Sequence, residues 1–303
     1  MARGCCHTLH PTPYTLAFLL LAAPLPAQSL YDRAQSARGR GQVDSAWELI
    51  QRAAELAPNA AEVQFLLGDI ACQKAGTASA FSAFGLARKC EAGYARAAAL
   101  APDSLGYVAA LASYLAQAPG IVGGDKDSAQ KLIARVRARD EVRGVFLQAG
   151  FWWTGNAAAK ERADSAVDAL GKARPAERPT QFRVAQWWER TGRPERALPV
   201  YQALAARNPG DGVVQFYVGR ELVLLKRNPR EAQKDLNVAA AVAAPAAGPD
   251  VFTFAPGAPW YRLGQTYEQL GMNDSARLCF RRALELNPQL GAARVSLDSL
   301  KHR

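Results

Sequence analysis

The chain has 303 residues, of which 49% are hydrophobic and 21% are charged, and its formal net charge is +10. These proportions are ordinary for a folded protein and exclude a highly charged, disordered chain. Alanine is abundant throughout, which favours helices because alanine loses no side-chain entropy there.

Residues 1–27 differ from the rest of the chain. Arg3 is followed by the apolar run YTLAFLLLAAPLPA (14–27), which is short and contains Pro24 and Pro26. We predict a secretory signal peptide that is cleaved near Ala27, with a transmembrane anchor as the alternative. Residues 28–303 would then be exported to the periplasm or cell envelope, with no transmembrane segment in the mature chain.

An exported basic chain is not expected to meet nucleic acid. Its charge favours an anionic surface instead, such as lipid headgroups, acidic wall polymers or acidic proteins. Three cysteines lie outside the first 27 residues: Cys72, Cys90 and Cys279. Cys72 and Cys90 fall on consecutive predicted helices, so a disulfide is one alternative. Burial as free thiols is the interpretation that we favour.

The glycine-rich stretch APGIVGGDKDSA (118–129) poses the question of a phosphate-binding loop. A lysine should follow the last glycine of such a loop, but here Gly124 is followed by Asp125. We therefore predict a turn between two helices. Asp125 or Asp127 would cap the second helix, and Asp127-x-x-Gln130 resembles a capping box.

The clearest pattern covers residues 258–290, which read as two amphipathic helices. Apolar and small residues recur at helical spacing in both, at Trp260, Leu263, Gly264, Tyr267, Ala276, Phe280 and Ala283. The small residues would let the two helices approach closely. Pro288 ends the second helix.

This segment resembles a tetratricopeptide repeat, whose period is 34 residues. Similar copies begin near residues 30, 184 and 218, and Trp153 and Trp188 repeat at nearly the same interval. The resemblance implies an all-α solenoid of helix-turn-helix units forming a right-handed superhelix over residues 28–303. We expect about seven helix pairs and a C-terminal capping helix (291–303).

Three parts of the chain depart from the regular pattern. The copy at residues 61–102 is longer than the period, and we assign the excess to a long turn at TASAFSAFG. Residues 103–178 match weakly. An Ala/Pro/Gly-rich insert (241–259) precedes the last pair.

Few residues offer catalytic chemistry. His302 is the only histidine after residue 27, which argues against a Ser-His or Cys-His pair and against histidine-based metal sites. The carboxylates of Asp69, Glu189 and Glu268 could meet across a groove, although solvated helix faces are the favoured interpretation. We therefore predict no enzyme activity, no cofactor and no metal.

In the family that this chain resembles, the first helix of each pair lines a concave groove that binds extended peptides. The corresponding positions are all aromatic: Tyr31, Phe65, Phe182, Phe216 and Tyr261. One helical turn later come Gln35, Asp69, Gln186, Arg220 and Gln265. The aromatic residues would anchor a partner, or would instead pack between adjacent repeats.

A second candidate surface is basic. Lys131, Arg135, Arg139 and Arg143 recur every four residues and predict one ridge along a helix, with a solvated face as the alternative. The sequence thus predicts a scaffold that binds a protein or peptide partner in the cell envelope. The alternative is a binding module for a small solute or an envelope glycan.

Overall fold

The computed structural model describes residues 25–243 and 252–300, which form fifteen α-helices and no strand. They divide into two compact units, one ending at Arg139 and the other beginning at Asp140. The predicted all-α class is confirmed. The predicted signal peptide lies almost wholly outside the described residues. The first described helix begins at Leu25, and Ala27 within it is fully buried in a hydrophobic cluster with residues of the next two helices.

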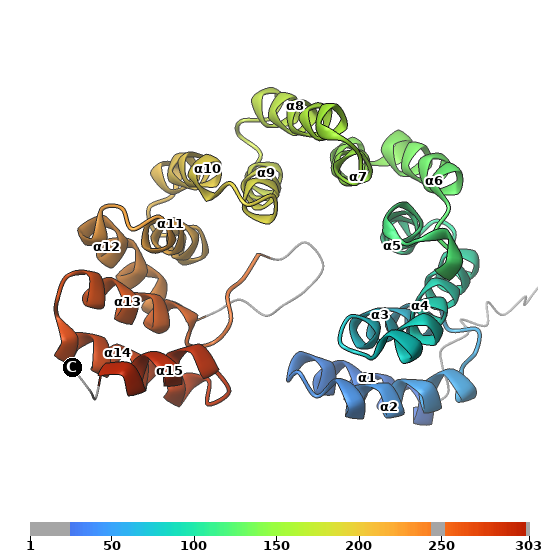
Figure 1. Ribbon diagram of the computed structural model, residues 1–303, viewed down its shortest axis with the longest axis horizontal. Coiled ribbons are helices and arrows are strands. Elements are labelled where there is room, and N and C mark those ends of the chain that lie inside the picture. Colours follow the sequence, from blue (N-terminus) through green and yellow to red (C-terminus); the bar gives the residue numbers. More distant parts are fainter. Residues whose placement is uncertain (1–24, 244–251, 301–303) are drawn as a thin grey trace, which may run out of the picture. The chain divides into compact units, whose positions relative to one another are not determined.

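The first unit consists of three helix pairs, which can be followed in Figure 1. Its elements are α1 (Leu25–Gly39), α2 (Val43–Leu56), α3 (Ala61–Ala75), α4 (Ala80–Leu100), α5 (Leu105–Gln117), the 3₁₀ turn η1 (Gly120–Val122) and α6 (Lys126–Arg139). Each odd-numbered helix packs on the even-numbered helix that follows it.

The second unit continues the same scheme. Its helices are α7 (Glu141–Trp153), α8 (Ala157–Ala173), α9 (Arg178–Arg190), α10 (Pro194–Arg207), α11 (Gly212–Leu224), α12 (Pro229–Ala240), α13 (Ala258–Gln269), α14 (Asn273–Leu286) and α15 (Gly291–Ser299). Helix α15 packs on α14. The expected seven pairs and capping helix are confirmed over the described residues, while the superhelical course of the whole chain stays a prediction.

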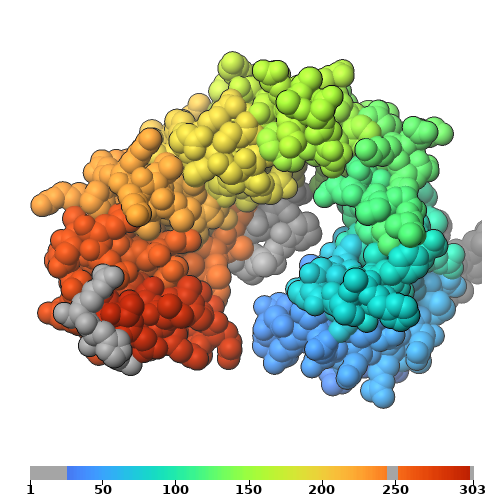
Figure 2. Space-filling view, viewed as in Figure 1, coloured from blue at the N-terminus to red at the C-terminus, as the bar shows by residue number. Residues whose placement is uncertain are grey.

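Small residues set the distance between paired helices. In the α13/α14 pair, Ala276, Phe280 and Ala283 are fully buried, as the sequence pattern predicts. A Cβ atom built on Gly264 would lie only 2.3 Å from a carbon of the Phe280 ring, so this position requires glycine. In the space-filling view, the side chains of successive pairs form a continuous surface within each unit (Figure 2).

Helix α4 contains the extra residues of the second repeat. The prediction of a long turn at TASAFSAFG is wrong, because residues 80–88 are helical and lengthen α4 at its start. This stretch is rich in alanine and lacks proline, which favours helix over turn. The added turns extend away from the core, and Phe81 is 95% exposed.

A disulfide joins α3 to α4. Cys72 and Cys90 are bonded, with 5.1 Å between their Cα atoms, a normal separation for a disulfide. The favoured interpretation of free thiols is therefore wrong for this pair, because α3 and α4 approach closely enough for the bond. It holds for Cys279, a buried free thiol.

The glycine-rich stretch forms the predicted turn. Gly123 has a φ of +98°, which favours glycine, and α6 begins at Lys126. The Asp125 carboxylate accepts hydrogen bonds from the backbone nitrogens of Asp127 and Ser128, each at 3.0 Å. The cap is thus Asp125 with Ser128. The predicted pairing of Asp127 with Gln130 is wrong, since both already lie inside the helix.

Candidate peptide-binding surfaces

Three aromatic rings from successive repeats line the first helices of the first unit: Tyr31 on α1, Phe65 on α3 and Tyr107 on α5. We call them the unit-1 aromatic row. The centroids of the Phe65 and Tyr107 rings lie 4.9 Å apart, and all three side chains are only partly buried. Tyr107 was missed in the sequence. It lies 42 residues after Phe65, the length of the long repeat, so its equivalence becomes visible once that length is used.

Polar groups flank the unit-1 aromatic row. Gln35 donates a hydrogen bond of 2.8 Å to the Tyr31 hydroxyl, which places the predicted aromatic and polar residues side by side. Asp69 accepts a hydrogen bond of 3.0 Å from Tyr94 and pairs with Arg38. Burial raises the pKa of the Tyr94 hydroxyl, and Asp69 raises it further, so this hydroxyl stays a donor.

The equivalent positions of the second unit are different. Phe182 on α9 is fully buried and Phe216 on α11 is 5% exposed, so neither lines an open groove as predicted. Part of the reason is packing between adjacent repeats, since the Phe182 ring lies 5.1 Å from Tyr201 and 4.8 Å from Tyr217. The other part is a segment that precedes α13, Phe252-Thr253-Phe254, which we call the FTF segment. Its rings cover the predicted groove residues.

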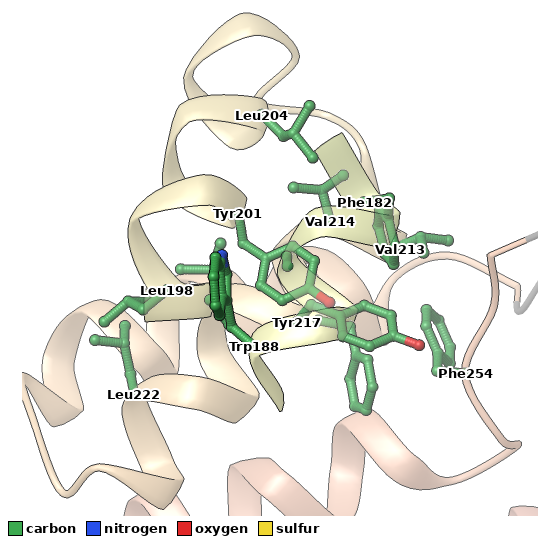
Figure 3. Close-up of a cluster of buried hydrophobic side chains, with 14 of the residues drawn as sticks. Phe182, Trp188, Leu198, Tyr201, Leu204, Val213, Val214, Tyr217, Leu222 and Phe254 are labelled. Atoms are coloured by element: carbon green, nitrogen blue, oxygen red, sulfur yellow. The ribbon is translucent and has the colours of Figure 1, made fainter. Parts of the chain in front are cut away.

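The FTF segment meets both phenylalanines directly. The Phe252 ring stacks on Phe182 with centroids 4.1 Å apart, and the Phe254 ring lies 5.0 Å from Phe216. Figure 3 shows Phe254 on its extended segment beside Tyr217. The only sequence signal was a pair of phenylalanines in a stretch that otherwise indicates a loop.

The last predicted groove position, in α13, is half-buried. Gln265 donates a hydrogen bond of 3.0 Å to the Tyr261 hydroxyl, repeating the arrangement of Gln35 and Tyr31. The Tyr261 ring also lies 5.9 Å from Phe280, so it contributes to packing within the repeat. Gln186 on α9 is half-buried beside Tyr217.

Arg220 lies in a polar cluster of the second unit. Its guanidinium pairs with Glu189 of α9 and with Glu221, at 2.8 Å for the latter, and lies 4.3 Å from the centroid of the Tyr217 ring. Glu221 is only 1% exposed. Burial raises the pKa of its carboxyl, and Arg220 opposes this shift. The predicted groove cation is therefore neutralised from within the chain.

The three carboxylates considered above, those of Asp69, Glu189 and Glu268, belong to two units. Asp69 is paired in the first unit, Glu189 is paired with Arg220, and Glu268 lies on α13. Burial raises the pKa of the Cys279 thiol to about 11, which makes it a poor nucleophile. Among the described residues, no group of three His, Cys, Asp or Glu side chains could hold a metal ion.

The predicted basic ridge is divided between two helices. Helix α6 ends at Arg139, and Arg143 belongs to α7, because Asp140 caps that helix by accepting from the Arg143 nitrogen at 2.8 Å. Arg139 pairs with Asp103, and Arg135 donates to the Pro102 carbonyl at 2.6 Å. The prediction of one continuous ridge along a helix is therefore wrong.

None of the described helices is both long and apolar enough to cross a membrane.

No curated protein matches the chain. A solved tetratricopeptide repeat protein from Parabacteroides merdae is 11% identical with a TM-score of 0.46, over 92% of this chain and 100% of that one. A thermophilic tetratricopeptide repeat protein from Thermus thermophilus is 16% identical with a TM-score of 0.34, over 91% and 100%.

The family model described as tetratricopeptide repeat matches residues 258–290, which form α13 and α14. The same arrangement of two packed helices recurs through both units. Residues 258–290 are therefore a tetratricopeptide repeat, and the other helix pairs of both units share its two-helix arrangement.

Proposed function

We propose that this chain is a non-enzymatic scaffold of the cell envelope that binds an extended peptide or protein partner on the first helices of its repeats. The unit-1 aromatic row carries this proposal, because its three rings come from successive repeats and remain partly exposed. Aromatic side chains offer large contact areas at a low entropic cost and are common binding anchors. Gln35 and Asp69 lie beside these rings and offer polar contacts to a peptide backbone.

Two observations support an envelope location. The apolar run at residues 14–27 has the composition of a signal peptide. The bond between Cys72 and Cys90 suits an oxidising compartment, since disulfides are rare in the reducing cytosol.

The proposal is tested by capture from an envelope extract on immobilised residues 28–303. We expect the variant Tyr31→Ala/Tyr107→Ala to retain at least tenfold less of a defined bound protein, since each anchor contributes upward of about 1 kcal/mol. The matched control is Phe81→Ala, which removes an exposed ring on α4 and should change nothing. The helicity and melting of both variants are compared first.

Equal capture by the row variant and the control would contradict the proposal. Captured material that survives protease treatment would also contradict it, because the ligand would then be a solute or glycan.

A further inference from the structure

The FTF segment lies in an unusually long connection. Residues 241–257 join α12 to α13. The other connections between consecutive pairs within a unit, and the one to α15, have four residues each: 57–60, 101–104, 174–177, 208–211 and 287–290. Four residues are thus enough to pass from one repeat to the next, and chain continuity does not require the FTF segment.

The segment contacts the repeats in the manner of a bound peptide. In extended backbone, residues two apart point to the same side, and Phe252 and Phe254 meet Phe182 of α9 and Phe216 of α11, two successive first helices. The Tyr217 hydroxyl donates a hydrogen bond of 3.1 Å to the carbonyl oxygen of Thr253. Rings on alternate residues and a main-chain contact between them are features of extended-peptide recognition.

Phe254 is only 7% exposed, yet an open hollow borders its side chain. Its side chain, together with Val242, Trp260 and Leu286, lines an open hollow of about 430 Å³. Phe254 therefore covers the α11 surface on one side and borders open space on the other.

We propose that the α9–α11 face is a second peptide site, that the FTF segment fills it as an internal ligand, and that it accepts in exchange a partner's extended peptide with aromatic residues at positions i and i+2. This inference rests on the proposed function, since it assigns a ligand pattern to the same class of surface. A tethered segment acts at an effective concentration of about millimolar. A partner's peptide must therefore compete with the FTF segment. This competition lowers the apparent affinity of the peptide for the intact chain.

The test uses the full chain and a fluorescent peptide of sequence DVFTFAPG, which is that of residues 250–257. We expect the variant Phe252→Ala/Phe254→Ala to bind this peptide at least tenfold more tightly than the unaltered chain, because the internal competitor has lost its rings. Adding Phe216→Ala should abolish the gain. The control peptide DVSTSAPG should not bind either protein.

A second measurement needs no substitution. Millimolar DVFTFAPG should raise deuterium uptake at residues 252–257 of the unaltered chain, since the internal segment is displaced. Unchanged uptake would overturn the proposal. So would a folded double variant that fails to bind, or a double variant that unfolds, because the rings would then belong to the core.

The two proposals fail separately. Adding Tyr31→Ala/Tyr107→Ala to the Phe252→Ala/Phe254→Ala variant should leave binding of DVFTFAPG unchanged. Loss of binding on that addition would place the peptide on the unit-1 aromatic row and overturn the second site alone. Failure of the capture experiment, with peptide exchange intact, would remove the proposed function of the first unit alone.

Discussion

Asp235 is a buried carboxylate on α12, only 8% exposed. Burial, reinforced by Glu231, raises the pKa of its carboxyl from 3.8 to about 6, although Lys234 opposes the shift. The folded chain therefore holds this proton more tightly than the unfolded chain does. The contribution of protonated Asp235 to the free energy of unfolding is fully present below about pH 4. It is lost as the pH rises to about 6.

We predict that Asp235→Asn raises the melting temperature at pH 7.5, because the amide has the shape of the acid and carries no charge. The penalty removed is on the order of 3 kcal/mol, which corresponds to roughly 6–12 °C for a unit of this size. Near pH 4 the two proteins should melt together. The measurement is thermal unfolding followed by circular dichroism from pH 4 to 8.

The control for this prediction is Asp274→Asn, since the Asp274 side chain is 98% exposed. It should leave the difference between pH 4 and pH 7.5 unchanged. A melting profile of Asp235→Asn that parallels the unaltered protein at every pH would mean that Asp235 is not penalised by burial.

Some individual positions could be predicted from the sequence and others could not. The pairing of Tyr31 with Gln35, and of Tyr261 with Gln265, follows from a spacing of four on one helix, which is a local property. The stacking of Phe252 on Phe182 joins residues seventy positions apart in the chain. No helical period links such residues, so local patterns predict an aromatic stripe without revealing what covers it.

At the scale of elements, the α3/α4 pair depends on two glycines at its crossing. A Cβ atom on Gly93 would lie 2.6 Å from the Cα atom of Gly68. The nearest atoms belong to backbone, so they cannot move aside as a flexible side chain can. We predict that Gly93→Ala destabilises the first unit by roughly 1–3 kcal/mol, as overpacking does in cores.

Gly85→Ala is the matched control, because Gly85 lies in the same helix and nothing would lie within 4 Å of its Cβ atom. It should raise stability by roughly 0.5–1 kcal/mol, since alanine favours helix more than glycine. Thermal unfolding of the two variants should therefore shift in opposite directions. Shifts of the same sign would refute a close contact at Gly93.

The helix pairs themselves were predictable. Apolar residues recur along each amphipathic helix with a period of 3.6 residues, and residues that end helices, such as glycine and proline, mark the turns. The extra length of α4 was not. A run of small residues with serine and glycine suits either a loop or a helix, and the choice was settled by helix propensity. The disulfide between Cys72 and Cys90 could not be predicted either, because it depends on how closely α3 and α4 cross.

At the scale of the whole molecule, each unit consists of stacked helix pairs that contact mainly their neighbours. Stability in such chains is approximately a sum of repeat and nearest-neighbour terms. The disulfide lies in the first unit and closes a separation of 18 residues. A bond of that span stabilises by roughly 3 kcal/mol. Reducing it should therefore loosen the pairs near α3 and α4 and leave remote pairs intact.

We predict that a reductant raises hydrogen–deuterium exchange in α1–α6 and leaves the protection of α9–α14 unchanged, because the energetic change decays along the repeats. Exchange is followed by mass spectrometry of peptic fragments. The variant Cys72→Ala/Cys90→Ala should show the raised exchange with and without reductant, which excludes an effect through Cys279. An equal loss of protection in α9–α14 would mean that the two units unfold as one cooperative body. They would then be separate in structure but not independently stable.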